Sequence, residues 1–256
     1  MFSDVLTTVV WKQYPQPFSH VIPEDSLLTT LRVEQGCPFY LQAHIQRLKQ
    51  QAARRHLSMP SLDLAGLQTW LKAYQHVAVL RLRILLLAGQ KNNHQIVTQL
   101  THVTEKVSSL RLVQVQDPGL CCPQFKTYAM LQRLSMINEA HQKGFDDAFT
   151  CSDEGNILES TFGNLFWIEN NKLYLPDPNL PYYLGVTLTQ LLQQNIWEIE
   201  KIQCPPEAIS QQASVFRTNA LHGPFPIVCL GAHHFKVDPK LTLFLQQTWR
   251  SLAFEK

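Results

Sequence analysis

Two residues of this chain, Lys126 and Glu159, combine types and surroundings that could support covalent chemistry. Lys126 lies between Phe125 and Tyr128 in the run P-Q-F-K-T-Y. Such neighbours lower the pKa of an ammonium group and leave a free amine that can act as a nucleophile. Glu159 interrupts the apolar strand pattern of residues 155–166. A carboxylate there is costly to desolvate unless a cation or a strong hydrogen-bond donor meets it.

One cofactor, pyridoxal phosphate, uses both kinds of group. It forms a Schiff base with a lysine, and an acidic group opposite its ring nitrogen keeps that nitrogen protonated, so that the ring can accept electrons. Six segments of the chain follow a family pattern in order and spacing. They are S-L-L-T-T-L-R-V at 26–33, H-I-Q-R-L at 44–48, F-K-T-Y at 125–128, L-E-S-T-F-G-N-L-F at 158–166, Y-L-G-V-T at 183–187 and V-F-R-T-N-A-L-H-G-P-F-P-I at 215–227.

With these segments the chain resembles the class IV (fold type IV) pyridoxal-phosphate enzymes. This group comprises the branched-chain aminotransferases, the D-amino-acid aminotransferases and the aminodeoxychorismate lyases. The resemblance implies an α+β, two-domain fold like that of D-amino-acid aminotransferase, with the cofactor at the domain interface. It also implies a homodimer that acts on a small-molecule substrate.

The resemblance assigns roles to individual residues. Lys126 would form the Schiff base and serve as the general base, and Glu159 would face the ring nitrogen. Asn164 would brace local backbone without taking part in chemistry. The cofactor phosphate would be held by Arg47, Val186, Thr187, Asn219 and Ala220.

Two of these assignments have plain structural alternatives. Arg47 lies at the edge of an apolar helical stripe, where an arginine is usually a solvated surface residue. Thr187 precedes a predicted helix, where it could be a simple cap. A helix N-terminus also offers free N–H groups to an anion, and a guanidinium suits a phosphate. The resemblance favours the phosphate role for both residues.

The segment N-A-L at 219–221 resembles the lyases more than the aminotransferases. It predicts a 4-amino-4-deoxychorismate lyase of folate biosynthesis, which releases pyruvate and forms 4-aminobenzoate. A class IV aminotransferase acting on D-amino or branched-chain amino acids is the alternative, and a non-catalytic paralogue is a second. Met130 and Leu131 stand where lyases often carry arginine or asparagine-tyrosine. The substrate carboxylates would then need another partner, for which the candidates are Arg32, Arg217 and His222.

Composition restricts the other classes of function. The chain has 256 residues, 45% of them apolar, and a formal charge of +2, so no basic field points to nucleic acid or to an anionic membrane. The start M-F-S-D lacks the basic region of a secretory signal, and the longest apolar run, at 84–88, cannot span a bilayer. Six cysteines without CxxC spacing indicate reduced thiols in a cytoplasmic protein. Cys229 with His233 and His234 lacks a second ligand pair, so no metal site is predicted.

Periodicity and turn residues divide the chain into elements. The predicted domains are residues 1–115 and 124–256, joined by a linker at 116–123 that contains Asp-Pro-Gly. Helices are expected at 41–52, 61–74 with Ser61 as the N-cap, 128–141, 188–192 and 239–254. Strands are expected at 5–11, 26–33, 77–87, 96–100, 110–115, 148–151, 157–161, 164–168, 173–175, 215–219 and 227–230.

Overall fold

The computed structural model of the chain describes residues 22–87, 95–103, 108–117 and 125–253. It divides into two compact units, one of residues 1–104 with 125–128, and the other of residues 105–124 with 129–256. The short segment 125–128, which carries Lys126, therefore belongs to the first unit. The predicted strand 5–11 and most of the predicted linker 116–123 lie outside the described residues.

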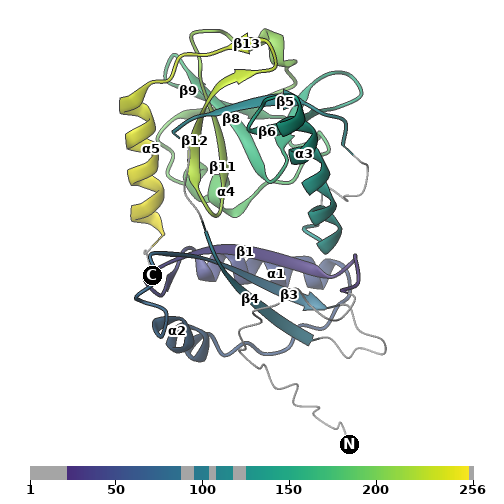
Figure 1. The fold of residues 1–256 in the computed structure, drawn as a ribbon, viewed down its shortest axis with the longest axis vertical. Coiled ribbons are helices and arrows are strands. Elements are labelled where there is room, and N and C mark those ends of the chain that lie inside the picture. The colour runs from purple at the N-terminus through teal and green to yellow at the C-terminus, as the bar shows by residue number, and fades with distance from the viewer. Residues whose placement is uncertain (1–21, 88–94, 104–107, 118–124, 254–256) are drawn as a thin grey trace, which may run out of the picture. The chain divides into compact units, whose positions relative to one another are not determined.

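The first unit is an antiparallel four-stranded sheet with two helices. Its elements in chain order are β1 (Leu27–Glu34), β2 (Cys37–Pro38), α1 (Leu41–Arg54), α2 (Leu64–Lys72), β3 (Val79–Leu87) and β4 (Gln95–His102). The strand order is β2-β1-β3-β4. Helix α1 lies along one face of the sheet (Figure 1). Its apolar residues recur at helical spacing and form the core with alternate residues of β1 and β3.

The second unit is built around a sheet that closes on itself. Its strands are β5 (Leu110–Gln114), β6 (Asp147–Cys151), β7 (Ile157–Ser160), β8 (Gly163–Glu169), β9 (Lys172–Pro176), β10 (Glu198–Ile202), β11 (Ser214–Asn219), β12 (Gly223–Leu230) and β13 (His233–His234). The order is β10-β9-β8-β11-β12-β5-β6-β7, and β7 also pairs with β8. This extra pairing closes the strands from β8 to β7 into a ring.

Helices cover the outside of this ring. They are α3 (Leu134–Gln142), α4 (Val186–Leu192) and α5 (Pro239–Leu252), with short 3-10 turns η2 (Tyr128–Arg133) and η3 (Pro206–Ala208). Helix α3 packs against β6, and α5 packs against β12 (Figure 1). Asp238 caps α5, because its Oδ1 accepts hydrogen bonds from the backbone N–H groups of Lys240 and Leu241. Within the described residues, no helix is both long and apolar enough to cross a membrane.

The predicted α+β class is confirmed, and most predicted elements lie within a few residues of their expected bounds. Helix α2 is an exception, because it starts at Leu64 and is capped by Asp63 rather than Ser61. The Asp63 carboxylate accepts a hydrogen bond of 2.8 Å from the N–H of Gly66. The predicted helix 128–141 also begins differently, as the tighter turn η2. Apolar spacing alone does not separate the two helix types over so short a stretch.

Several strands depart from the expected pattern. The two-residue strands β2 and β13 were not predicted, nor was strand β10, which extends the sheet in parallel with β9. Strand β12 begins at Gly223 rather than at Ile227, so it includes Pro224 and Pro226. Both prolines precede Ile227, the first residue of β12 that is paired with β5. Proline is tolerated where a strand has no partner on the side of its missing N–H group.

Candidate active site

Glu159 is held on the inner part of the second unit by strands on both sides. It lies on β7 and is paired with Asn164 on β8, which is in turn paired with Thr218 on β11. Directly opposed residues of antiparallel strands project to the same face. Glu159, Asn164 and Thr218 therefore form a polar row on one face of the sheet, and Glu159 is only 4% exposed.

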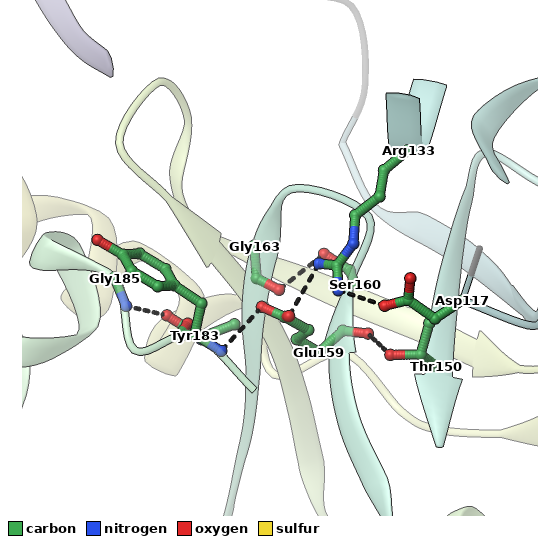
Figure 2. Close-up of polar contacts among 9 residues, drawn as sticks. Asp117, Arg133, Thr150, Glu159, Ser160, Gly163, Tyr183 and Gly185 are labelled. Atoms are coloured by element: carbon green, nitrogen blue, oxygen red, sulfur yellow. Dashed lines mark hydrogen bonds and ion pairs between the residues drawn. The ribbon is translucent and has the colours of Figure 1, made fainter. Parts of the chain in front are cut away.

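The cationic partner that the sequence requires for Glu159 is Arg133 (Figure 2). Arg133 Nη1 donates a 2.8 Å hydrogen bond to Glu159 Oε1, and Arg133 Nη2 also contacts the Asp117 carboxylate. The Arg133 side chain is 4% exposed. It is thus a buried guanidinium between two carboxylates. The sequence patterns did not predict this partner, although a charged side chain among Met130, Leu131 and Leu134 was a visible signal.

The ionisation of Glu159 depends on opposing effects. Burial raises the pKa of the Glu159 carboxyl, whereas the Arg133 guanidinium and the N–H of Tyr183 act in the opposite direction. The Tyr183 N–H is 3.4 Å from Glu159 Oε2. A carboxylate has about four lone-pair positions, so these two contacts leave acceptor capacity for a further donor. The arrangement suits a carboxylate that meets a protonated nitrogen.

Asn164 fastens the turn that leads into α4. Its Nδ2 donates to the carbonyl of Tyr183 at 2.6 Å, and its Oδ1 accepts from the N–H of Gly185 at 2.8 Å. The prediction that Asn164 braces local backbone is confirmed. Because Glu159 and Asn164 both bind this turn, the acid and the start of α4 are held in fixed relation.

Thr187 lies in the first turn of α4, and it is not the cap. Gly185 is the N-cap and carries no side chain that could bind the exposed N–H groups, so the interpretation of Thr187 as a simple cap is wrong. Among the described residues, the buried hydroxyl oxygens of Thr161, Thr187 and Thr218 have no hydrogen-bond partner. Thr161 follows Glu159 by two residues, and Thr218 is in the polar row. These hydroxyls can hydrogen-bond a polar ligand.

Asn219 is the last residue of β11, and Ala220 follows it. The Asn219 Oδ1 accepts hydrogen bonds of 3.0 and 2.9 Å from the N–H groups of Leu221 and His222. The side chain therefore holds the turn between β11 and β12. The backbone N–H groups of Leu221 and His222 are thereby used within the turn.

In the first unit, Lys126 is anchored through its backbone to β1. The N–H of Leu28 donates to the Lys126 carbonyl at 2.9 Å, and the N–H of Tyr128 donates to the Ser26 carbonyl at 2.8 Å. Thr127 forms an isolated antiparallel bridge with Leu27. The segment after the linker thus adds to the start of β1, which fixes the backbone position of the lysine.

Arg47 is positioned by a hydrogen-bond chain within the same unit. Its Nη2 donates to Thr29 Oγ1 at 2.7 Å, and Thr29 Oγ1 lies 2.7 Å from His44 Nδ1. Thr29 Oγ1 accepts the bond from Arg47, and it keeps a proton and a second lone pair with which it can bond His44 Nδ1. The chain therefore ties Arg47 to the buried imidazole through one hydroxyl.

Electrostatics favour a neutral His44. Burial lowers the pKa of His44 well below its usual value, and the positive charges of Arg47 and Lys126 lower it further. Lys126 and Arg47 therefore influence the same buried imidazole. The structure brings these two predicted residues together in the first unit, and it brings Glu159, Val186, Thr187, Asn219 and Ala220 together in the second.

The depressed pKa of His44 predicts acid sensitivity. The unfolded chain binds a proton near pH 6.5 while the folded chain does not, so stability is full above that pH and falls as the pH decreases towards the folded-state pKa. The loss is up to about 1.4 kcal/mol per pH unit. Urea unfolding of the wild type and of His44→Gln at pH 7 and pH 5 measures it, with exposed His141 replaced by Gln as the control. An equal loss in His44→Gln would contradict this explanation.

The residues weighed for substrate recognition have other contacts. Arg217 donates to the buried Asp147 carboxylate at 2.9 Å, and as the neighbour of Thr218 on β11 it points to the opposite face from the polar row. Arg32 is paired with Glu34 through a 2.6 Å hydrogen bond. The backbone N–H of His222 is used in the Asn219 turn. Arg217 is therefore not placed on the face that carries Glu159.

A family model matches most of the chain, and a curated relative matches part of it. The model of the family described as amino-transferase class IV matches residues 26–229. An aminodeoxychorismate lyase from Vibrio harveyi is 28% identical over 108 residues, a match that spans 40% of this chain and 40% of that protein.

Solved structures share the fold. A candidate 4-amino-4-deoxychorismate lyase from Legionella pneumophila has a TM-score of 0.73 at 23% identity, covering 88% of this chain and 91% of that one. The PLP-bound form of a hypothetical aminotransferase from Mycobacterium tuberculosis has a TM-score of 0.77 at 17% identity, covering 94% of each chain. A branched-chain aminotransferase from Thermoproteus uzoniensis has a TM-score of 0.72 at 16% identity, covering 89% and 84%.

Proposed function

This chain belongs to the amino-transferase class IV family, and we propose that it is a 4-amino-4-deoxychorismate lyase. In this reaction the substrate loses pyruvate and its ring becomes the aromatic ring of 4-aminobenzoate. The observation that carries the proposal is the buried acid Glu159, fixed between strands and tied to the start of α4. The family, with a PLP-bound structural relative, implies pyridoxal phosphate as the cofactor.

The residues present fit that cofactor. Glu159 keeps acceptor capacity for a ring nitrogen, and the buried Thr187 hydroxyl has no partner among the described residues. We assign the phosphate to Arg47, to the N–H groups of Val186 and Thr187, and to the backbone of Asn219 and Ala220. When bound, pyridoxal phosphate supplies an electron sink for the reacting carbon. Glu159 stabilises the protonated ring nitrogen that this requires.

Lys126 has two roles in the proposal. Its Nζ would hold the cofactor covalently. The same amine, when free, would accept the proton from the substrate ring carbon while the bond between the ring and the enolpyruvate oxygen breaks, and it would return that proton to the enolpyruvate carbon to give pyruvate. The ring becomes aromatic in this step, so aromatisation provides much of the driving force. The protein then has mainly to position groups and move one proton.

Three observations favour the lyase over the aminotransferase. They are the N-A-L segment at 219–221, the matched segment of the Vibrio harveyi lyase, and the fold shared with the Legionella pneumophila protein. The aminotransferase is the second candidate, because other solved relatives are aminotransferases and Lys126 would serve that reaction equally. We further propose that the protein acts as a cytoplasmic homodimer, which sedimentation analysis would test.

An assay with both kinds of substrate tests the function. The purified protein, loaded with pyridoxal phosphate, is expected to release equal amounts of pyruvate and 4-aminobenzoate from 4-amino-4-deoxychorismate. It is expected to be much slower with D-amino or branched-chain amino acids and a keto-acid acceptor. Fast transamination without pyruvate release would reject the lyase in favour of the aminotransferase. A protein that stays colourless with added cofactor would reject both.

A further inference from the structure

Helix α5 is bonded to the segment that joins β11 to β12. The side-chain amide of Gln246 donates hydrogen bonds to the carbonyl of His222, at 3.3 Å, and to the carbonyl of Pro224. Asn219 binds the same segment through two backbone N–H groups. We call residues 219–223 the β11–β12 turn. The backbone of this turn is thus held by its own first residue and by a residue of α5.

Gly223, the last residue of the β11–β12 turn, packs directly against Trp249 of α5. Gly223 is paired with Asn219 in the register of β11 and β12, and its φ of +65° lies in the left-handed region that favours glycine. A Cβ at this position would lie 2.3 Å from the indole ring of Trp249. Trp249 is only 1% exposed, so its ring has little room to move. Gln246 and Trp249 are three residues apart and share one face of α5.

The same helix also contacts α4. Leu245 of α5, Leu188 of α4 and Phe216 of β11 belong to one buried apolar cluster, and Leu188 directly follows Thr187. Phe216 is paired with Phe166 on β8, and the two rings are stacked with their centroids 5.4 Å apart. Helices α4 and α5 therefore rest on the same apolar patch of the sheet.

This apolar patch borders the polar row of the candidate site. Phe166 follows Asn164 by two residues on β8, and Phe216 precedes Thr218 by two residues on β11. Side chains two residues apart on a strand lie on the same face, so the patch and the row share the face that carries Glu159. Because α5 contacts both α4 and the β11–β12 turn beside this row, it sets the separation between them.

We propose that Gln246 and Trp249 are positioning residues that hold the β11–β12 turn at the separation from α4 that a phosphate group requires. This rests on the proposed function, which assigns the cofactor phosphate to the start of α4 and to the backbone of Asn219 and Ala220. Hydrogen bonds weaken steeply when their direction is poor, so donors from two elements must converge on the anion. The helix that contacts both elements therefore governs affinity for the phosphate.

The test compares two aldehydes, pyridoxal phosphate and pyridoxal, of which only the first carries the phosphate. Absorbance titration of the full chain, freed of cofactor, gives both Kd values for the wild type, Gln246→Met, Gln246→Lys and Gly223→Ala. Methionine has about the length of glutamine but donates no hydrogen bond, and lysine restores a donor. Gln247→Met is the matched control, because Gln247 is the exposed neighbour on the same helix. Thermal melting shows whether each variant is folded.

Gln246→Met is expected to weaken binding of pyridoxal phosphate about 10-fold, the effect of one or two hydrogen bonds, and to leave binding of pyridoxal unchanged. Gly223→Ala should weaken it at least as much, because the turn must move away from Trp249. Gln246→Lys should recover part of the loss, and Gln247→Met should match the wild type. In the loaded proteins, phosphorus NMR should show a shifted phosphate resonance for Gln246→Met and the wild-type resonance for Gln247→Met.

Equal weakening for both aldehydes, or unchanged binding of pyridoxal phosphate by folded Gln246→Met, would overturn the proposal. If Gly223→Ala does not fold, the two Gln246 variants decide the question. A wild type that binds pyridoxal phosphate but releases no pyruvate would reject the lyase function, while the two Kd values still decide the role of α5. A wild type with no preference for pyridoxal phosphate over pyridoxal would overturn both the phosphate assignment and the role of α5.

Discussion

Lys126→Ala protein is expected to lose the visible absorbance of covalently bound cofactor and at least about 10⁴-fold in turnover. The amine at this position both anchors the cofactor and moves the proton, and a positioned general base alone contributes about 10²–10⁴-fold. Absorbance spectra and pyruvate release measure the two losses separately. Lys49→Ala is the matched control, since Lys49 is an exposed lysine on α1.

Borohydride reduction provides an independent measurement. Reduction of the loaded wild type should fix the cofactor on the peptide that contains Lys126, as mass spectrometry will show. The backbone bonds of Leu28 and Tyr128 to this segment do not involve the lysine side chain, so Lys126→Ala should fold normally. A yellow, active Lys126→Ala protein, or a label on another peptide, would remove Lys126 from the mechanism.

Arg133→Met is expected to lower the free energy of unfolding by about 3–5 kcal/mol at pH 7. The change leaves the buried Glu159 carboxylate without its guanidinium, and removing one partner of a buried pair is strongly destabilising. Loss of Arg133 also removes the main effect that opposes the raised pKa of Glu159. Protonation of Glu159 should therefore relieve part of the loss as the pH falls. Urea unfolding of the cofactor-free protein at pH 7 and pH 5 measures both effects.

Two further variants make this prediction specific. In Arg133→Met with Glu159→Gln, both charges are absent, so much of the lost stability should return. Arg111→Met is the control for an exposed pair, because Arg111 contacts Asp146 at 3.3 Å with its side chain 53% exposed, and it should cost less than about 1 kcal/mol. If Arg133→Met were no worse than Arg111→Met, the buried pair would not be holding Glu159 in place.

The sequence predicted the parts of the site that local patterns encode. The apolar surroundings of Glu159 showed that its carboxylate needs a cation, and the spacing from Glu159 to Asn164 matched a bracing role that two hydrogen bonds confirm. The assignment of Arg47 needed the family resemblance, because an arginine at the edge of a helical stripe is ordinary. Its hydrogen bond to Thr29 fixes the position of the guanidinium within the first unit.

The remaining parts depend on contacts between distant segments. Arg133 and Glu159 are 26 residues apart, and no periodicity relates a 3-10 turn to a strand. Likewise, the sequence predicts the strands of Phe166 and Phe216, but only the register of β8 against β11 places the two rings together. Register is set by the whole sheet rather than by either strand alone. Pairings of this kind are therefore not visible in one sequence.

The closed ring of the second unit fixes the positions of its strands but not the sequences of the turns that join them. Strand β7 is bonded to β6 and to β8, so Glu159 could slide along the sheet only if hydrogen-bond ladders on both sides opened together. The turns between strands carry no such restriction. In such a scaffold the loops, and with them the substrate specificity, can change during evolution while Glu159 keeps its burial and its orientation.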